Sequence, residues 1–577
     1  MDKKVTSIGG QALMEGVMMR GPTSMAMAVR NKDGFIEVDS VRLKPIRWYN
    51  KVPVLRGVVS FVESLYNGVN TITKSAQVVG DEDEKISNGG MIFAVCAGVL
   101  LAIGLFMLVP ELIASLIDGL IGHSVLLKSL IAGALRMIIF VAYLLIVSKM
   151  KDIRRTFMYH GAEHRTINCY ESGMELTVEN VQKCSTRHNR CGTTFLFIVM
   201  VVSILLFAIV NWILDLLIGD MLSGFVKKLV YFGIKLVILP FTAGISYEIL
   251  KGVAKLPDNI FAKILRAPGL ALQGLTTKIP DDDMAEVAIK SFLTVLKMEE
   301  NSAEPTRAFG NLELPDVRKY IIKRIGKEEV EADWILCDTL KCKRGDLPLI
   351  KYVSLADFGK IKSICDRRVS GEPLDYILGK SYFYGLEIKV NDSVLIPRME
   401  TELLVSEAIS AISDRYSSCV VLDLCTGSGC IAKALAVNTS ATVVASDISA
   451  LKVADENLEG TSVTLIKSDL FDAFNPNSFD VIVSNPPYIR SGDINSLSAE
   501  VKHEPRIALD GGESGLDFYK RIVCSAPIYL KKGGCLLLEI GYDQAEPITR
   551  LMETFGFSGV KTLKDYDGND RIVIGKV

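Results

Sequence analysis

Four long apolar stretches constrain what the first half of this chain can fold into. They lie at Met91–Val109, Ser129–Ser148, Gly192–Leu214 and Leu229–Tyr247. A helix of about 20 residues crosses the roughly 30 Å hydrocarbon core of a bilayer. We therefore predict an α-helical membrane part over residues 1–300, with four spans at 91–109, 129–148, 192–214 and 229–247. Arg136 and Lys235 interrupt two of these spans, so each must face a bundle interior or water.

The flanking charges predict an orientation. The segment 149–192 is rich in lysine and arginine, whereas 118–128 holds only Lys128 and 219–228 holds Lys227 and Lys228. Basic segments next to spans stay in the cytoplasm. Residues 1–30 lack the continuous apolar core of a cleavable signal. The sequence therefore predicts a multi-pass protein of the cell membrane that contacts the lipid bilayer and has both ends in the cytoplasm.

The second half has the pattern of an α/β protein. We expect a linker at 301–310 and a small helical domain at 311–380. Beyond it, strand-like segments alternate with helix-like ones, and the strands are expected at Val420–Leu424, Thr442–Ser446, Val463–Ile466, Val481–Ser484 and Cys535–Ile540. Strands separated by helical lengths predict a Rossmann-like domain with a parallel sheet over 381–577.

The carboxyl ends of these strands carry a nucleotide-binding pattern. The first strand runs into a turn with Gly427 and Gly429, where the backbone can approach a ligand closely. Asp447 ends the second strand and can accept the hydroxyls of a ribose. Leu470 follows the third strand. This spacing suits a ligand that contains a nucleoside.

Asn485-Pro486-Pro487-Tyr488 ends the fourth predicted strand and is the most specific motif of the chain. Two consecutive prolines cannot donate to a sheet ladder, so the strand must stop there. The Asn485 side chain and the Pro486 carbonyl can then accept the two N–H bonds of one planar amino group. Tyr488 can lie against a flat group beside them. The alternative, a plain Asn-Pro turn, does not explain this placement after three nucleotide-type strand ends.

Several segments between 311 and 577 resemble the release factor glutamine methyltransferase family (PrmC/HemK). The resemblance rests on Arg367–Gly379, Leu395–Glu402, Asp423–Ile431, Asn485–Ile489, Glu504–Leu509 and Gly515–Tyr519. It implies transfer of a methyl group from S-adenosylmethionine to the glutamine of a Gly-Gly-Gln loop in class 1 peptide chain release factors. It also implies that 311–380 recognises the substrate.

The resemblance assigns roles to individual residues. The implied cofactor positions are Cys425, Thr426, Gly427, Ser428, Gly429, Asp447, Leu470 and Asn485. The implied substrate-binding and catalytic positions are Asn485, Pro486, Pro487 and Tyr488. Cys425 and Met399 stand where the family usually has glycine and proline. A side chain at position 425 narrows the space beside the cofactor, so we expect it to affect cofactor affinity.

Adenine-N6 DNA methyltransferases share the tetrapeptide and provide the alternative function, because adenine also presents a planar amino group. DNA binding requires a basic surface. Residues 301–577 instead contain more acidic than basic residues, so we expect no stable nucleic-acid binding. A further alternative is a cofactor-binding module without catalysis.

Three of the five histidines lie within 149–192. His160 and His164 are four residues apart and share a face if the segment is helical. Imidazole, thiolate and carboxylate groups can hold zinc or a similar divalent ion. The candidate metal ligands are His160, Glu163, His164, Cys184, His188 and Cys191. The alternative is a polar loop with hydrogen-bonded histidines, since His-Gly-Ala-Glu-His lacks the His-Glu-x-x-His order and glycine weakens a helix.

The first half also resembles a known family. Ile8–Pro22, Val54–Gly57 and Tyr159–Arg165 are similar to segments of YqhQ-like membrane proteins. The resemblance implies a membrane protein whose role is unknown and could depend on a metal. The whole chain is thus predicted to be a bifunctional fusion, with a methyltransferase attached to a YqhQ-like membrane domain.

Overall fold

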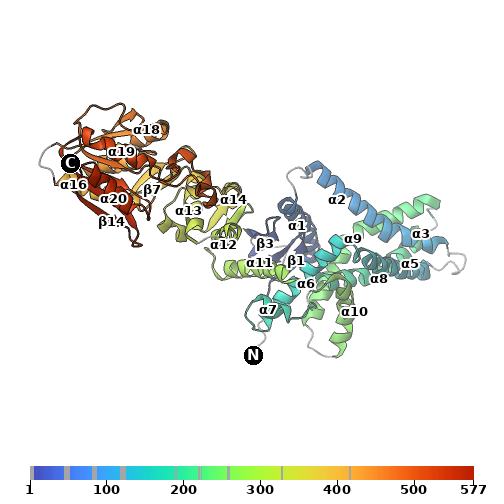
Figure 1. Cartoon of the computed structure of the whole chain (residues 1–577). Helices are drawn as coiled ribbons and strands as arrows, with labels where there is room; N and C mark the ends of the chain where they lie inside the picture. Colours follow the sequence, from blue (N-terminus) through green and yellow to red (C-terminus); the bar gives the residue numbers. More distant parts are fainter. Residues whose placement is uncertain are drawn as a thin grey trace. The chain divides into compact units, whose positions relative to one another are not determined.

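The computed structural model describes residues 6–44, 52–80, 88–116, 125–188, 191–218, 221, 224–255, 260–326, 329–414 and 418–577. It divides into two compact units, Met1–Leu312 and Glu313–Val577 (Figure 1). The predicted linker 301–310 lies within the first unit. There, the Arg307 N–H donates to Ser40 Oγ and the Gly310 N–H donates to Glu37 Oε2. This segment is therefore bound to the first unit along its length.

The first unit begins with an antiparallel sheet that sequence analysis did not predict. Its strands, in spatial order, are β1 (Gly9–Leu13), β2 (Gly16–Arg20), β3 (Ser24–Arg30) and β4 (Ile36–Arg42). Helices α6 (Lys151–Glu171) and α11 (Asp282–Glu300) lie beside the sheet (Figure 1). They pack on it through an apolar cluster that includes Met19, Tyr159 and Phe292. This sheet positions one wall of the cavity described below.

Four apolar helices of the first unit are long enough to cross a membrane, as expected. Their apolar segments are Phe93–Leu116, Val125–Val147, Gly192–Ile218 and Val226–Val253. The first combines α2 (Asn88–Ile103), a π-helical turn (Gly104–Leu108) and α3 (Val109–Leu116), and the others belong to α5 (Val125–Val147), α8 (Gly192–Ile218) and α9 (Gly224–Lys255). The unit also contains α1 (Leu55–Val79), α7 (Val178–Gln182) and α10 (Ile260–Thr276).

Both cations within the apolar segments face other helices. The buried Arg136 guanidinium donates from Nε to the carbonyl oxygen of Phe106 at 2.8 Å. The buried Lys235 ammonium forms an ion pair with Glu111. This confirms that each cation faces the bundle interior, where a paired charge costs less than one exposed to lipid.

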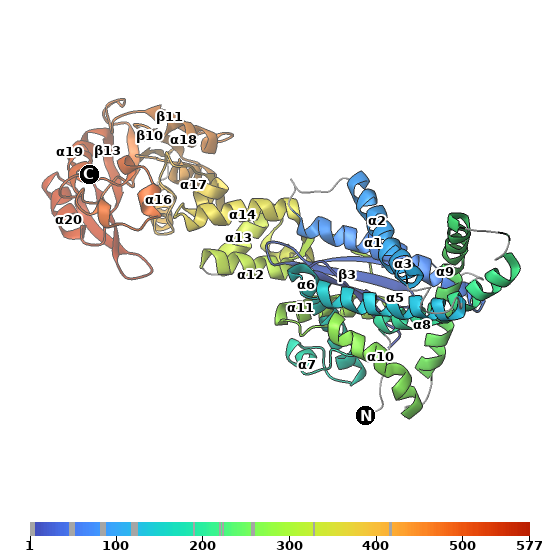
Figure 2. The same cartoon turned by 90° about the vertical axis from the view of Figure 1, so that its right-hand side faces the viewer.

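The second unit starts with a small helical domain (Figure 2). Its helices are α12 (Leu314–Ile325), α13 (Glu329–Leu340), α14 (Leu355–Val369) and α15 (Leu374–Leu378), with short strands β5 (Asn311–Glu313) and β6 (Tyr352–Ser354). Buried Arg368 on α14 pairs with Glu331 on α13 and with Glu500 of the following domain. The hairpin β7 (Lys380–Phe383) and β8 (Leu386–Lys389) then leads into the main sheet.

That sheet has seven strands. In spatial order they are β11 (Thr464–Lys467), β10 (Thr442–Asp447), β9 (Val420–Leu424), β12 (Phe479–Ser484), β13 (Leu530–Glu539), β15 (Asp570–Lys576) and β14 (Ser558–Lys564). The five strands from β11 to β13 are parallel, and β15 is antiparallel to both of its neighbours. The five predicted strands are therefore present, but the sheet is mixed because of the β14–β15 hairpin.

Helices cover both faces of this sheet, because successive residues of a strand point to opposite sides. Val421 and Val483 pack in one apolar cluster with α16 (Thr401–Ser413), α17 (Cys430–Asn438) and α18 (Leu451–Leu458). Leu422 and Ile482 pack in the other with α19 (Asp517–Tyr529) and α20 (Ala545–Thr554). The two layers leave the carboxyl ends of the strands open to a ligand.

Candidate functional site

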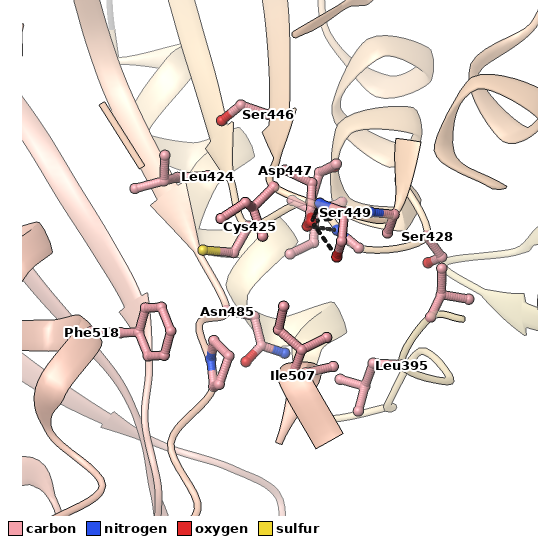
Figure 3. A pocket seen from close by; sticks show the side chains of 18 of the residues that line it. Leu395, Leu424, Cys425, Ser428, Ser446, Asp447, Ser449, Asn485, Ile507 and Phe518 are labelled. Carbon is pink, nitrogen blue, oxygen red and sulfur yellow. Dashed lines mark hydrogen bonds between the residues drawn. The ribbon is translucent and has the colours of Figure 1, made fainter. Parts of the chain in front are cut away.

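A pocket of about 200 Å³ lies at the carboxyl ends of the parallel strands of the second unit (Figure 3). The chain winds from β9 outward through β10 to β11 and then returns to β12 on the other side of β9. Ligands of open α/β sheets bind at such a reversal of strand order. Cys425 follows β9, Ser449 follows β10, Leu470 follows β11 and Asn485 follows β12, and all of them line the pocket.

The turn after β9 has a backbone that favours glycine. Cys425 has a φ of 62°, a left-handed conformation that costs a non-glycine residue about 1–3 kcal/mol. This explains why a glycine is usual here in the family that the segment resembles. Burial raises the pKa of the Cys425 thiol to about 12, so the thiol stays neutral. Gly429 caps α17 with a φ of 81° and is not among the residues that line the pocket.

Asp447 is held at the pocket by backbone donors. Its Oδ1 accepts the N–H groups of Ser449 at 2.9 Å and Ala450 at 3.3 Å, and its Oδ2 accepts the Gly427 N–H at 2.9 Å. Figure 3 shows the Asp447 carboxylate beside Ser449 in the loop that follows β10. A carboxylate has about four lone-pair sites, so capacity remains for a ribose hydroxyl. Asp447 can therefore accept a hydroxyl group of a ligand bound in this pocket.

Asn485 points into the pocket, and its amide is oriented by a residue whose role sequence analysis missed (Figure 3). The Asn485 Nδ2 donates to Thr401 Oγ1 at 3.3 Å. The Thr401 side chain in turn hydrogen-bonds Glu539, a buried carboxyl at the end of β13 whose pKa burial raises to about 7. With Nδ2 engaged by Thr401, Oδ1 is the amide atom available to accept a hydrogen bond from a ligand.

Two chain segments close over this pocket. Leu395 and Arg398 come from the first, and Ile507 comes from the second. Buried Glu504 joins them, because it accepts the Ile396 N–H at 3.1 Å and pairs with Arg398. Leu395–Glu402 and Glu504–Leu509, two of the segments that carry the family resemblance, are thus held together at the pocket by these contacts.

The remaining residues of the tetrapeptide differ in placement. Both prolines are buried, but only Pro487 is among the residues that line the pocket beside Asn485. The Tyr488 side chain packs against the apolar cluster beneath β12 and β13. Its carbonyl oxygen accepts the Gln544 Nε2–H at 3.0 Å. Asn485 and Pro487 are therefore the residues of the motif that line the pocket, and Pro486 lies between them in the chain.

A second set of candidate residues converges in the first unit. The ligand atoms of His160, His164 and Cys191 lie within 4.8 Å of one another. His160 Nδ1 lies 2.9 Å from the Thr276 carbonyl oxygen, and His164 Nδ1 lies 2.6 Å from that of Thr186. Each Nδ1–H therefore donates to a backbone carbonyl, so that Nε2 carries the lone pair, as in metal-binding histidines. The Nε2 of His160 lies 3.3 Å from Cys191 Sγ.

Electrostatics favour the neutral imidazoles that bind metal ions. Burial lowers the pKa of His160, and burial together with His160 lowers that of His164 to about 3. Burial raises the pKa of the Cys191 thiol to about 11, although Thr193 opposes the shift by hydrogen bonding to the sulfur. A bound cation would displace this proton, since the thiolate is the ligand.

The glycine between the two histidines does not break the helix. α6 is continuous from Lys151 to Glu171. A Cβ on Gly161 would lie 1.8 Å from the carbonyl oxygen of Lys278, so glycine is needed for close packing. The same neighbouring segment supplies the Thr276 carbonyl to His160. Gly161 thus supports the histidine geometry.

Three other metal candidates lie outside this group. Glu163 and His188 line the same cavity as the group, and His188 Nε2 lies 3.5 Å from Glu171 Oε2. Cys184 lies apart from it, where its Sγ donates to the Asn180 carbonyl oxygen at 3.4 Å and packs near Cys169. The structure therefore brings together three of the six candidates as possible ligands.

Comparison with known proteins is consistent with the division of the chain into two units, Met1–Leu312 and Glu313–Val577. Family models match residues 52–298 ("Protein of unknown function (DUF1385)"), 317–379 ("PrmC N-terminal domain") and 400–504 ("Methyltransferase small domain"). A release factor glutamine methyltransferase of Geobacter sulfurreducens is 41% identical over 269 residues, which cover 45% of this chain and 94% of the relative. The uncharacterized protein YqhQ of Bacillus subtilis is 32% identical over 321 residues, which cover 53% of this chain and 96% of the relative. The chain belongs to both families.

The YqhQ-like unit is thus joined to a methyltransferase unit that depends on S-adenosylmethionine. Among solved structures, a release factor-specific protein-(glutamine-N5) methyltransferase of Alicyclobacillus acidocaldarius is 29% identical and covers 33% of this chain and 98% of its own, with a TM-score of 0.22.

Proposed function

We propose that the methyltransferase unit methylates the side-chain amide nitrogen of the glutamine in the Gly-Gly-Gln loop of class 1 release factors. The observation that carries this proposal is the Asn485 amide, which lies in the same pocket as Asp447 and presents Oδ1 to a ligand. The relatives named as release factor glutamine methyltransferases support the choice of substrate.

The proposed chemistry relies on positioning. An amide nitrogen is a poor nucleophile, because its lone pair is delocalised into the carbonyl group. Asn485 Oδ1 and the Pro486 carbonyl would accept its two N–H bonds and aim the nitrogen at the transferred methyl. S-adenosylmethionine supplies that methyl as an electrophilic sulfonium when it is bound. Such positioning can remove several kcal/mol of barrier, and the nitrogen loses its proton after attack, so no strong base is needed.

An assay with radiolabelled S-adenosylmethionine tests this proposal against the DNA alternative. The full-length protein in detergent should label a purified class 1 release factor and should not label double-stranded DNA. Labelling of DNA adenine without labelling of the release factor would favour the alternative function. Cofactor binding without any transfer would favour a module that has lost catalysis.

Thr401→Val should slow methyl transfer by about tenfold at saturating cofactor. Valine has the same shape but cannot hold the Asn485 amide or donate to Glu539, and a lost hydrogen bond of this kind costs about 1–1.5 kcal/mol. Steady-state kinetics should show a lower kcat with little change in the KM for S-adenosylmethionine. Thr401→Ser, which keeps the hydroxyl, should restore most of the rate. If Thr401→Val and Thr401→Ser methylate at the same rate, the Thr401 hydroxyl does not position the Asn485 amide.

We also propose that the YqhQ-like unit crosses the cell membrane four times, with the methyltransferase unit in the cytoplasm. The basic segment between the second and third apolar helices supports this orientation. A reporter that fluoresces only in the cytoplasm should be bright when fused after Lys255 and dark when fused after Ile218. The opposite pattern would reverse the orientation.

A second candidate function concerns a metal ion in the YqhQ-like unit. We infer that His160, His164 and Cys191 hold zinc or a related divalent ion. Their convergence supports this site, and so do the lone pairs on the Nε2 atoms of both histidines, of which that of His160 already lies 3.3 Å from Cys191 Sγ. It uses three of the six residues proposed from sequence, and it leaves Cys184 without a role in binding.

The full-length protein, purified without chelator, should contain about one metal ion per chain. His160→Ala combined with His164→Ala should abolish binding, because one remaining donor cannot retain the ion. Cys184→Ser is the matched control and should bind normally. Elemental analysis checks all three proteins. An unmodified protein without metal would leave the histidines as hydrogen-bonded structural residues.

A further inference from the structure

A cavity of about 500 Å³ in the YqhQ-like unit combines the candidate metal ligands with a sheet edge. His160, His164 and Cys191 line one side, and Gly9–Gln11 of β1 line another. We propose that this cavity is the active site of a metal-dependent peptidase in which Glu163 is the general base. The proposal rests on the metal site proposed above and adds a reaction and a substrate class to it.

The ligand set is that of a catalytic rather than a structural site. Structural zinc sites use four protein ligands, whereas catalytic sites use three and leave one position open for water or substrate. Three donors converge here beside the cavity. His188 also lines the cavity, but its Nε2 is directed to Glu171. The open coordination position would therefore face the cavity.

Glu163 has the placement required of a general base. It is 4% exposed and lines the cavity between the two histidines of α6. It accepts a hydrogen bond from the Gly10 N–H, while its Oε2 is buried without a partner. An unpaired buried carboxylate oxygen is costly and therefore calls for an explanation. An attacking water would provide the missing partner.

The residue order also fits this reaction. His160-Gly161-Ala162-Glu163-His164 has the order His-x-x-Glu-His, in which two histidines bind zinc and the glutamate acts on water. It is the reverse of the His-Glu-x-x-His order of other zinc-dependent peptidases. On a helix, positions 160, 163 and 164 lie on one face, and α6 is helical throughout this segment.

Gly10 allows this carboxylate to approach β1. A Cβ at position 10 would lie 2.8 Å from Glu163 Cδ and 2.7 Å from the Met18 carbonyl oxygen. Any larger residue would therefore push Glu163 away from the strand. The strand and the helix thus meet at the proposed catalytic carboxylate.

The cavity walls favour a polypeptide as substrate. Within the described residues, β1 is an edge strand that pairs only with β2. The Gly10 N–H of this edge donates to Glu163, so an extended peptide would bind there by exchanging that hydrogen bond for one to its own main-chain carbonyl oxygen. Gln11, Ser64 and Asn67 line the cavity and provide further donors and acceptors. Arg20 also lines it, and its guanidinium lies 3.7 Å from the Glu63 carboxylate. These groups suit a peptide backbone better than an acyl chain.

The proposed reaction is hydrolysis of an amide. A divalent cation would polarise the carbonyl group and lower the pKa of water. Glu163 accepts a proton as the water oxygen bonds to the carbonyl carbon. It then delivers that proton to the nitrogen as the C–N bond breaks. The second proton of the water passes from the new carboxyl group to the amine, so the products are a carboxylate and an ammonium group, and water is the only co-reactant.

Glu163→Gln tests the role of the carboxylate. The full-length zinc-loaded protein in detergent is mixed with a pool of random-sequence fluorogenic octapeptides. We expect cleavage by the unmodified protein and a loss of at least 100-fold in Glu163→Gln, which should still hold one zinc per chain. Glu175→Gln, which alters an exposed glutamate beyond α6, is the matched control and should cleave normally.

Binding provides a second readout that does not need turnover. A peptide hydroxamate should bind the zinc-loaded Glu163→Gln protein at least tenfold more tightly than acetohydroxamate does, as measured by competition. Equal affinities would exclude a peptide-binding cavity. Absence of zinc from the unmodified protein would contradict the metal site itself. Zinc retention without peptide cleavage, or unchanged cleavage by Glu163→Gln, would overturn the peptidase proposal alone.

Discussion

Asn485→Ala should reduce methyl transfer to a release factor by about ten- to a hundredfold or more. The variant removes one of two acceptors for the substrate amide and leaves an N–H group unpaired, which costs about 1–3 kcal/mol of transition-state binding. Thr401, which accepts the Asn485 Nδ2–H, would lose this partner as well. Initial rates at saturating S-adenosylmethionine measure the effect.

The control for this variant is Asn475→Ala, which alters an exposed asparagine of the same unit. It should methylate at the unmodified rate. Cofactor affinity should change little in Asn485→Ala, since Asp447 and the turn after β9 provide most cofactor contacts in this account. An unchanged rate in Asn485→Ala would contradict the proposed mechanism.

Asp447→Ala should weaken cofactor binding more than it slows methyl transfer at saturating cofactor. We expect at least a tenfold increase in the Kd for S-adenosylmethionine. The substitution removes the ribose acceptor and also releases the N–H groups of Gly427, Ser449 and Ala450. Charge-assisted hydrogen bonds of this kind contribute about 1.5–3 kcal/mol each. Isothermal titration calorimetry measures the affinity directly.

Asp472→Ala, at an exposed position of the same unit, serves as the control and should bind the cofactor normally. At saturating cofactor, Asp447→Ala should recover a substantial part of its rate. Normal affinity together with a lost rate would instead place Asp447 in the chemical step.

Apolar patterning predicted the methyltransferase sheet well where strands are buried. β9 and β12 lie in the middle of the sheet, and both are mostly apolar, with Asp423 and Asp480 as their only charged residues. β14 is an edge strand in which polar residues are frequent and most side chains are partly or fully exposed, so it gave no comparable signal. β14 was missed for that reason, whereas β15 contains the buried apolar run Ile572–Ile574, a signal that the sequence analysis did not use.

The sheet of the YqhQ-like unit was missed for a different reason. β3 has the sequence Ser-Met-Ala-Met-Ala-Val-Arg and is almost entirely buried. Methionine and alanine favour helices, whereas strands are enriched in β-branched and aromatic residues. Packing against α11 therefore overrides the local preference.

The sites show where local patterns stop being sufficient. Asn485 and Asp447 could be predicted because each directly follows a strand that ends at the pocket. Glu539 is the only charged residue in the predicted strand 535–540, and a lone charged residue in an apolar strand could have marked it as a candidate site residue. Its link to Thr401 depends on tertiary structure, however. Likewise, spacing could pair His160 with His164, but only the fold shows that Cys191 joins them and Cys184 does not.

The most direct test of the central claim is to locate the transferred methyl group. The full-length protein is incubated with S-adenosylmethionine and an unmodified class 1 release factor, and the peptide containing Gly-Gly-Gln is sequenced by tandem mass spectrometry. This account predicts one added methyl group on the glutamine amide, and a greatly reduced amount with Asn485→Ala. A methyl group on another residue, or none on a release factor that other enzymes of this family can modify, would contradict it.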